Sequence, residues 1–259
     1  MFDKYSYYYR SVQETDGAID FMEKVYRKHF KKPLKTLSED FCGTFALSCD
    51  WVKKDRDNRA IGVDLSREPI EYGKKNYLSK LSVTDRSRIS LHLKDVRSPK
   101  LPKADLIGAL NFSYFIFKKR KDLLAYFKNC YLRLSPKGVL VLDCFGGKAT
   151  QEPCEDKSEF KDFTYYWDQT SFNPITNEGL FYIHFKPKNQ KKRLRAFKYD
   201  WRMWSIPELR DILEEAGFKT IEVYTEDSNR KGEGNGVFTL KTREEDCDAW
   251  IAYITAVRK

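Results

Sequence analysis

The sequence predicts a doubly wound α/β fold of the Rossmann type, with a mostly parallel seven-stranded sheet and an inserted antiparallel β-meander. Short apolar runs of five to seven residues alternate with amphipathic helical segments through the first 145 residues, which is the pattern of a parallel sheet covered on both faces. These runs lack the polar alternation of half-exposed strands. After residue 145 the rhythm changes to aromatic strands separated by turns, and helix and strand return near the C-terminus.

The first half of the chain contains four helical and five strand-like segments in regular order. Asp16 is placed to cap the first helix and Ser66 the third, whose first turn also holds Pro69. The helices are expected over 16–30, from the 42–44 turn to about 54, over 66–80 and over 121–134, and the strands over 34–40, 59–64, 89–94, 104–110 and 139–145.

The second half begins with strand-like segments rich in aromatic residues. Turns rich in asparagine, proline and lysine separate them, so we expect an antiparallel meander with its aromatic side chains on one face. Ser205 then caps a helix with Pro207 in its first turn, and Gly217 ends it. The meander strands are expected at 163–169, 179–185 and 194–201, and the last strands of the main sheet at 219–224 and 250–257.

The composition excludes several classes of protein. Aromatic residues make up 15% of the 259 residues, which intrinsic disorder does not allow. No apolar stretch reaches the roughly 20 residues of a membrane-spanning helix. The first residues lack a secretory signal and the six cysteines form no C-x-x-C pair, so a cytoplasmic protein with reduced thiols is expected. The net charge of +10 comes from short basic runs, which favour solvated faces over a nucleic-acid track.

The turn after the first strand reads SEDFCGTF at 38–45 and is the first candidate ligand site. Ligands of open α/β sheets bind at the carboxyl ends of the strands. A dinucleotide site would have three glycines there, but this turn has Gly43 alone and two acids, Glu39 and Asp40. Carboxylates repel a pyrophosphate and suit S-adenosylmethionine, which carries an ammonium, a sulfonium and no phosphate. Because successive strand residues face opposite ways, we expect Glu39 to face the ligand.

Two further acids close the next two strands. Asp64 ends the second strand 21 residues beyond Gly43, the spacing of an acid that accepts hydrogen bonds from a ribose diol; a helix cap is the alternative. Asp95 follows the third strand, where its carboxylate or a backbone amide could read an adenine edge while Val96 packs on the ring. Acids closing three consecutive strands are a more specific signal than any one of them.

The segments 39–44 (EDFCGT), 60–64, 94–97 (KDVR) and 106–114 resemble successive motifs of class I S-adenosylmethionine-dependent methyltransferases. The similarity spans most of the chain and implies a seven-stranded sheet with a terminal antiparallel strand. Phe45 stands where many relatives have a further glycine, so its ring must point away from the donor. A narrower group of such enzymes, of unknown substrate and with an inserted β-meander, is similar at NFSY (111–114), FGG (145–147), YWDQ (166–169), YDWRMW (199–204), GEGNGVF (232–238) and WIAY (250–253).

The resemblance also implies roles for segments and residues of a single methyltransferase domain. Its parts are an N-terminal lid and helix (1–30), a donor-binding half (31–145), a meander that roofs the acceptor site (160–202) and a C-terminal helix and strands (203–259). The resemblance implies donor contacts for Glu39, Gly43, Asp64 and Asp95. The further candidate donor contacts, which follow from their positions in the sequence, are Cys42, Leu65, Val96, Asn111, Tyr9 and Arg10. No metal site is expected.

The reactive methyl group should emerge near the end of the fourth strand, at 111–114. Transfer from a sulfonium is a direct displacement, so alignment in a dry pocket supplies much of the catalysis. Asn111 could accept a hydrogen bond from an amine and Tyr114 could orient it, as in the loosely similar Asn-Pro-Pro-Tyr loop of amino-directed methyltransferases. The alternative is that Phe112 and Tyr114 pack beneath the next helix.

Aromatic segments could wall this pocket. Residues 5–10 (YSYYYR) could form a lid, with rings near the sulfonium and Arg10 on the donor carboxylate; a segment packed on the sheet is the alternative. The glycine-rich 232–236 opens no helix, so a turn is expected there rather than a phosphate loop. The candidate acceptor contacts in the meander are Trp167, Tyr199 and Arg202.

The predicted function is methyl transfer from S-adenosylmethionine to a small-molecule acceptor, at nitrogen or oxygen. A methyltransferase acting on RNA or protein is the first alternative, favoured by the net charge and disfavoured by a roofed acceptor site. A nicotinamide-dependent oxidoreductase shares the fold but needs the missing glycines. A scaffold that kept the pocket without activity is the last alternative, and the intact acids argue against it.

Overall fold

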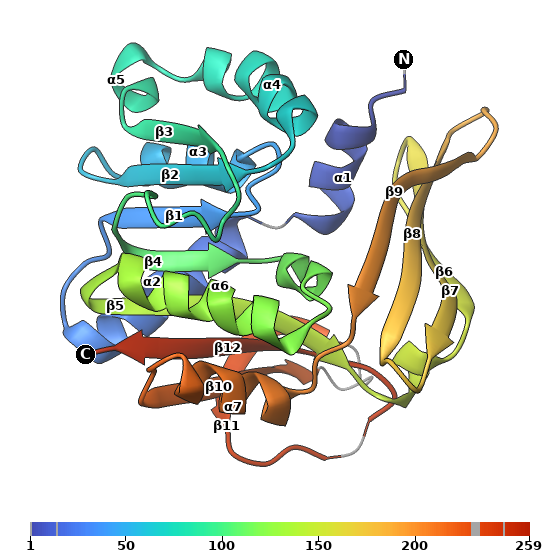
Figure 1. Ribbon diagram of the computed structural model, residues 1–259. Helices are drawn as coiled ribbons and strands as arrows, with labels where there is room; N and C mark the ends of the chain where they lie inside the picture. Colours follow the sequence, from blue (N-terminus) through green and yellow to red (C-terminus); the bar gives the residue numbers. More distant parts are fainter. Residues whose placement is uncertain (1, 14, 229–233, 246) are drawn as a thin grey trace.

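The computed structural model describes residues 2–13, 15–228, 234–245 and 247–259 (Figure 1). The helices are α1 (Lys4–Val12), α2 (Thr15–Phe30), α3 (Ala46–Lys54), α4 (Arg67–Asn76), α5 (Val83–Arg86), α6 (Arg120–Arg133) and α7 (Ile206–Glu215). The strands are β1 (Thr36–Asp40), β2 (Arg59–Asp64), β3 (Ile89–Leu93), β4 (Ala104–Ala109), β5 (Leu134–Gly146), β6 (Cys154–Glu159), β7 (Phe163–Asn173), β8 (Glu178–Pro187), β9 (Arg193–Arg202), β10 (Thr220–Ser228), β11 (Gly234–Lys241) and β12 (Trp250–Arg258). Across these described ranges, no helix combines the length and the apolar character needed to cross a membrane.

Strands β1 to β5 form the parallel half of the main sheet, and helices cover both of its faces (Figure 1). β1 pairs in parallel with β2 on one side and with β4 on the other, so the strand order reverses there. Side chains along β5 alternate between two buried clusters. Val139 and Val141 pack in the cluster that holds residues of α2 and α3, while Leu140 and Leu142 pack in the one that holds residues of α6 and α7. The predicted doubly wound sheet is confirmed.

The main sheet has eight described strands, in the order β11-β10-β12-β5-β4-β1-β2-β3, rather than the seven predicted. β12 runs antiparallel to both β5 and β10, which is the expected terminal antiparallel strand. The additional strand is β11, which pairs with β10 at the sheet edge. The turn expected at 232–236 is therefore wrong for 234–236, which lie in β11, while 232 and 233 lie outside the described residues.

The inserted meander has four described strands, in the order β6-β7-β8-β9, and begins at Cys154 rather than at residue 160. The additional strand β6 (CEDKSE) pairs antiparallel with β7, and all six of its side chains are exposed. It has no apolar pattern, so periodicity could not reveal it. Phe163, Ile183 and Phe185 form a small buried cluster on the face that meets α1.

Helix α1 lies between the main sheet and the meander and was not among the predicted elements (Figure 1). Asp3 caps it by accepting a hydrogen bond from the Ser6 amide at 3.0 Å. The ring of Tyr5 lies 4.7 Å from that of Tyr72 in α4, and Tyr7 stacks on Phe163 of β7 at 4.3 Å. The helix therefore joins the two parts through aromatic contacts. None of its side chains is fully buried, which explains the absence of a helical apolar pattern.

The core accounts for four of the cysteines. Cys42, Cys49, Cys130 and Cys144 are buried free thiols, as expected for reduced cysteines in and beside core strands. Burial raises the pKa of Cys49 to about 12, because a thiolate would lose its hydration there. These thiols are therefore packing groups rather than nucleophiles.

Candidate active site

The turn between β1 and α3 is held in an uncommon backbone conformation. Phe41, Gly43 and Phe45 all have positive φ, at 58°, 51° and 48°. The Gly43 amide donates a hydrogen bond to Asp64 Oδ2 at 2.7 Å, which ties the turn to the end of β2. Phe45 is fully buried against α4, where a Cβ on Gly73 would lie 2.6 Å from its ring. The ring therefore points away from the strand ends, as expected.

Glu39 and Asp40 have separate surroundings, as strand alternation predicts. Glu39 Oε2 accepts hydrogen bonds from the amide and the hydroxyl of Ser48, at 2.9 and 2.6 Å. Burial raises the pKa of Glu39 to about 7, because the carboxylate loses water that these two bonds only partly replace. The Asp40 side chain is fully buried in an ion pair with Arg133 at 2.8 Å. Glu39 is thus the acid available to a ligand.

Asp64 and Asp95, at the next two strand ends, already have partners in the protein. The two oxygens of Asp64 accept hydrogen bonds from the amides of Gly43 and Ser66, both at 2.7 Å, so each oxygen keeps a lone pair. Asp95 is held by Arg97, with Oδ1 3.0 Å from Nε and Oδ2 2.7 Å from Nη2. The guanidinium lowers the pKa of Asp95. Asp64 therefore combines a structural role with free acceptor capacity.

Three smaller candidate donor contacts differ in exposure. Cys42 is buried, and its amide donates to the carbonyl of Val63 at 3.0 Å. Leu65 is 72% exposed, so its side chain faces solvent. Val96 is buried, and its carbonyl accepts a hydrogen bond from Asn129 Nδ2 at 2.7 Å. The side chains of Cys42 and Val96 are therefore packed in the core, and both backbone groups of Cys42 already have partners within the protein.

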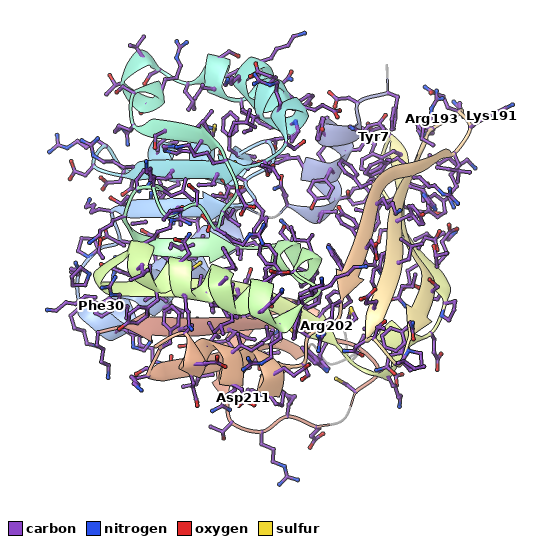
Figure 2. The ribbon with its side chains drawn as sticks, viewed as in Figure 1. Tyr7, Phe30, Lys191, Arg193, Arg202 and Asp211 are labelled. Carbon is purple, nitrogen blue, oxygen red and sulfur yellow. The ribbon has the colours of Figure 1, made fainter. Side chains whose placement is uncertain are left out.

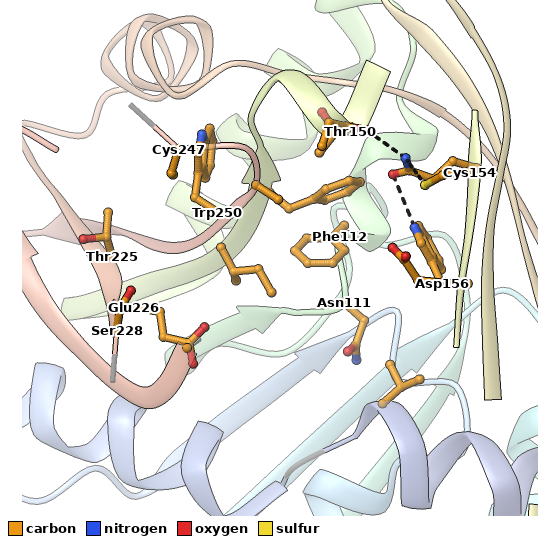
Figure 3. Close-up of a pocket in the computed structure, with 18 of the residues that line it drawn as sticks. Asn111, Phe112, Thr150, Cys154, Asp156, Thr225, Glu226, Ser228, Cys247 and Trp250 are labelled. Atoms are coloured by element: carbon orange, nitrogen blue, oxygen red, sulfur yellow. Dashed lines mark hydrogen bonds between the residues drawn. The ribbon is translucent and has the colours of Figure 1, made fainter. Parts of the chain in front are cut away.

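Two cavities of the described residues meet beside the end of β4. The sheet-end cavity, of about 640 Å³, is lined by Glu39, Phe41 and Leu110 together with residues of α2. The aromatic cavity, of about 680 Å³, lies between the edge of the main sheet and the meander (Figure 3). Its aromatic walls are Tyr8, Phe112, Phe145, Tyr165, Trp167, Tyr199, Trp201 and Trp250. The residues that line both cavities are Val12, Asn111, Phe112, Tyr165, Glu226 and Ile251.

The loop at this junction is held by Asp143 of β5. Asn111 and Phe112 have positive φ, at 55° and 56°, and their amides donate to Asp143 Oδ2 and Oδ1 at 2.5 and 2.8 Å. Burial raises the pKa of Asp143 to about 7. Asp143 was not among the predicted site residues, although it is the one charged residue in the apolar run 139–145. A single acid within an otherwise apolar strand was the signal that could have identified Asp143 from the sequence.

The expectation that Tyr114 orients the acceptor is wrong. Tyr114 is fully buried, and its hydroxyl donates to the carbonyl of Asp143 at 2.8 Å. Burial raises the pKa of this hydroxyl well above its usual value. The alternative of packing beneath the next helix holds for Tyr114, which lies near Phe127 of α6 with ring centroids 6.1 Å apart.

The meander contributes two of the three expected side chains to the aromatic cavity. Trp167 and Tyr199 line it, with ring centroids 6.0 Å apart. Arg202 does not: its guanidinium lies 3.8 Å from the ring centre of Trp204 and donates to Glu208 at 3.1 Å. Figure 2 shows Arg202 at the end of β9. The expectation for Arg202 is corrected, because its charge is already satisfied by an acid of α7.

Helix α1 faces the aromatic cavity with Tyr8, a residue of the predicted lid segment 5–10 that was not among the candidate donor contacts. Tyr8 lines that cavity, and burial raises its pKa to about 12. Tyr9 instead has its hydroxyl 3.4 Å from Asp50 Oδ2. Arg10 donates to Asp162, in the β6–β7 loop, at 2.9 Å and through a second bond. The carboxylate that Arg10 meets therefore belongs to this chain, which corrects the expected pairing with the donor.

One group of side chains within the described ranges has the composition of a metal site. Glu155, Asp168 and His184 lie together on the meander. His184 Nε2 is 3.0 Å from Asp168 Oδ2, and its Nδ1 accepts a hydrogen bond from the Arg195 amide at 2.8 Å. Lys192 forms an ion pair with Glu155. The lysine thus neutralises Glu155, while Asp168 has the His184 ring as its partner.

No protein-family model and no curated protein matches the chain, whereas solved structures do. An S-adenosylmethionine-dependent methyltransferase from Clostridium acetobutylicum has 17% identity over 99% of this chain and 98% of that one, with a TM-score of 0.69. An S-adenosylmethionine-bound amino pentose methyltransferase from Micromonospora echinaspora has 16% identity over 100% and 98%, with a TM-score of 0.68. A sugar N-methyltransferase from Streptoalloteichus has 17% identity over 100% and 94%, with a TM-score of 0.65. The chain therefore has the fold of these enzymes over its full length.

Proposed function

We propose that this chain, which has the fold of S-adenosylmethionine-dependent methyltransferases, transfers a methyl group from that donor to a small-molecule acceptor, at nitrogen or oxygen. One observation carries the proposal: the cavity that contains Glu39 and the aromatic cavity adjoin at Asn111 and Phe112, which line both. A direct displacement requires donor and acceptor to approach one point from opposite sides. Two cavities that meet at one loop provide for that approach.

The sheet-end cavity suits the amino acid part of the donor. Both hydrogen bonds that Glu39 accepts from Ser48 go to Oε2, which leaves Oε1 for an ammonium group. Phe41 lines the same cavity and offers an aromatic ring to a sulfonium. S-adenosylmethionine, when bound, supplies a methyl group made electrophilic by the positive sulfur.

The neighbouring strand ends suit the nucleoside part. Each oxygen of Asp64 keeps a lone pair that can accept a ribose hydroxyl. We assign the adenine to the groups after β3, where Asp95 and the Val96 backbone lie. The turn carries no three-glycine pattern, and Glu39 and Asp64 would repel a pyrophosphate, so a nicotinamide dinucleotide is disfavoured.

The acceptor side of the junction is built by Asn111 and the aromatic walls. The side-chain carbonyl of Asn111 can accept a hydrogen bond from an N–H or O–H of the acceptor. The surrounding rings offer the acceptor an apolar contact surface. A nucleic-acid acceptor would be favoured by the basic β8–β9 hairpin, but Lys191 and Arg193 lie at the hairpin tip, at the end of the meander opposite Arg202 (Figure 2). Trp201, which precedes Arg202, lines the aromatic cavity. The basic tip of the hairpin therefore lies at the far end of the meander from this residue of the cavity wall.

A ligand-stabilisation experiment tests this function. S-adenosylhomocysteine at 100 times its dissociation constant should stabilise the folded protein by about 2.7 kcal/mol, and NADH should not. Asp64→Ala should remove most of the effect, whereas Asp211→Asn, an exposed acid of α7, should leave it intact. Stabilisation by NADH without stabilisation by S-adenosylhomocysteine would defeat the proposal.

A further inference from the structure

We propose that the acceptor is a cationic amine, recognised by carboxylates and aromatic rings of the aromatic cavity; this inference rests on the methyltransferase function proposed above. Among the described residues, six charged side chains line that cavity: Asp156, Glu226, Asp227, Lys241, Glu244 and Glu245. Five of the six are acids, although the whole chain carries a net charge of +10. The described part of the cavity lining is therefore acidic, opposite in sign to the net charge of the protein.

Three of these acids, Asp156, Glu226 and Glu245, form no ion pair with a cation in the described part of the chain. Lys241 lies 3.5 Å from Asp227 and 3.7 Å from Glu244, and so compensates part of the charge of those two acids. Glu226 accepts a hydrogen bond from the Gly236 amide at 2.7 Å, and none of the ion pairs within the described ranges neutralises its charge. No described ion pair includes Glu226 or Asp156.

Glu226 and Asp156 approach the cavity from different parts of the fold. Glu226 comes from β10 of the main sheet and Asp156 from β6 of the meander. Figure 3 shows them on opposite sides of the cavity, with Phe112 and Asn111 between them. A ligand lying across the junction therefore meets negative charge on both sides.

The rings between these acids favour the same kind of ligand. Tyr199 and Trp201 have ring centroids 4.4 Å apart, and Trp167 extends the same wall. An ammonium near such rings gains cation–π attraction, which adds to its attraction to the carboxylates. Carboxylates offer acceptors and no donors, so a phosphate or carboxylate ligand would meet repulsion.

The position of Glu226 assigns it a part in the transfer. It lines both cavities, as Asn111 does, and so lies where the reacting nitrogen must sit. An ammonium attracted to this carboxylate must first lose one proton, which the carboxylate can accept and release to water. The freed nitrogen lone pair then forms the N–CH₃ bond while the S–CH₃ bond breaks, and the electron pair of the broken bond remains on sulfur. The product is a methylammonium and a neutral thioether.

Three probes with one ring system and different charges test the proposal: tryptamine, tryptophol and indole-3-acetate, which are cationic, neutral and anionic. Binding of each to the full-length protein is followed by ligand-observed NMR, with and without saturating S-adenosylhomocysteine. We expect tryptamine to bind at least tenfold more tightly than tryptophol, and indole-3-acetate to bind most weakly. Raising the salt concentration should reduce the preference. Equal affinities for the three probes, or tightest binding of indole-3-acetate, would overturn the inference.

Charge-removing variants separate recognition from folding. Glu226→Gln keeps an oxygen that can accept from the Gly236 amide, so the strand contact survives while the charge is lost. We expect it to lower tryptamine affinity severalfold and to leave tryptophol affinity unchanged. Asp156→Asn, on the exposed strand β6, should act in the same direction if Glu226→Gln does not fold. Selective tryptamine binding without any binding of S-adenosylhomocysteine would uphold the cationic pocket and refute the methyltransferase function.

Discussion

The carboxylate of Asp143, in β5, accepts a hydrogen bond from the backbone amide of Asn111, which is one of the residues that line both cavities. A second bond from the Phe112 amide completes the pair. Both loop residues have left-handed backbone conformations, which cost about 1–2 kcal/mol each for residues with a side chain. Asp143 therefore stabilises a loop conformation that the chain would otherwise avoid, and it fixes the position of Asn111.

Asp143→Asn should weaken this loop. An asparagine side chain has one acceptor oxygen and one donor nitrogen, so one of the two amides loses its partner and faces another donor. We expect the free energy of unfolding to fall by about 1–3 kcal/mol, measured by urea denaturation. Hydrogen exchange at residues 111 and 112 should become faster. The exposed Asp211→Asn in α7 is the control, and unchanged exchange in Asp143→Asn would show that other contacts hold the loop.

The raised pKa values of Glu39 and Asp143 predict how stability depends on pH. Both carboxyls have a pKa of about 7 in the folded protein, compared with about 4 in an unfolded chain. Between these values the folded state holds more protons than the unfolded state, so the free energy of unfolding should fall as the pH rises from about 4 to 7 and then level off. Urea denaturation from pH 5 to 8 measures this slope. It should be smaller in the double variant Glu39→Gln, Asp143→Asn, and parallel curves would refute the assignment.

Glu39 also predicts the pH dependence of donor binding. The side chain of Glu39 must be ionised to pair with the donor ammonium. Because burial raises its pKa to about 7, Glu39 is mostly protonated below that pH. The affinity for S-adenosylhomocysteine should therefore rise up to tenfold per pH unit below pH 7 and level off above it. Glu39→Gln should bind more weakly, with no such rise. Calorimetry at pH 6 in two buffers of different ionisation enthalpy should detect proton release when S-adenosylhomocysteine binds to the unmodified protein. It should detect none with Glu39→Gln.

The parallel half of the fold could be predicted because its pattern is local. The strand expected at 59–64 is found at Arg59–Asp64, since an unbroken apolar run reports burial on both faces directly. Strand β6 and helix α1 could not be predicted in this way. β6 is fully exposed and exists through pairing with β7, and α1 is stabilised by rings such as Phe163 that are distant in sequence.

The candidate site could be predicted where strand alternation decides the direction of a side chain. That rule predicts that Glu39 and Asp40 point to opposite faces of β1, and the structure places Glu39 beside Ser48 and Asp40 beside Arg133. Tyr114 and Arg202 illustrate its limit, because each is a plausible ligand contact by residue type. Their actual partners, the Asp143 carbonyl and Glu208, depend on how loops and helices pack. The acids of the aromatic cavity could not be predicted from the sequence either, because they come from separate strands and loops that only the tertiary fold brings together.

The buried pair of Asp40 and Arg133 predicts an asymmetric response to mutation. Arg133 is 3% exposed and Asp40 fully buried, and Ser38 and Tyr126 add hydrogen bonds to the pair. Arg133→Met leaves a buried carboxylate without its cation, so the free energy of unfolding should fall by about 3–5 kcal/mol. Adding Asp40→Leu should recover much of that loss, because no buried charge remains. Urea denaturation of both variants measures the difference, and equal losses would show that the hydrogen bonds matter more than the charge.

Helix α1 gives a test of whether the N-terminal segment is a lid or a packing element. Tyr7 of α1 stacks on the ring of Phe163, which belongs to the small buried cluster of the meander. Phe160, which lies outside α1, also stacks on the Phe163 ring, with the ring centroids 4.6 Å apart. Removing either ring costs the cluster a similar stacked contact, but only Tyr7→Ala loosens the helix that carries Tyr8 and Val12 to the cavities. If α1 is a lid, S-adenosylhomocysteine should dissociate severalfold faster from Tyr7→Ala than from Phe160→Ala, as measured by stopped-flow displacement. Equal dissociation rates in the two variants would identify α1 as a packing element, because its attachment would then have no effect on ligand escape.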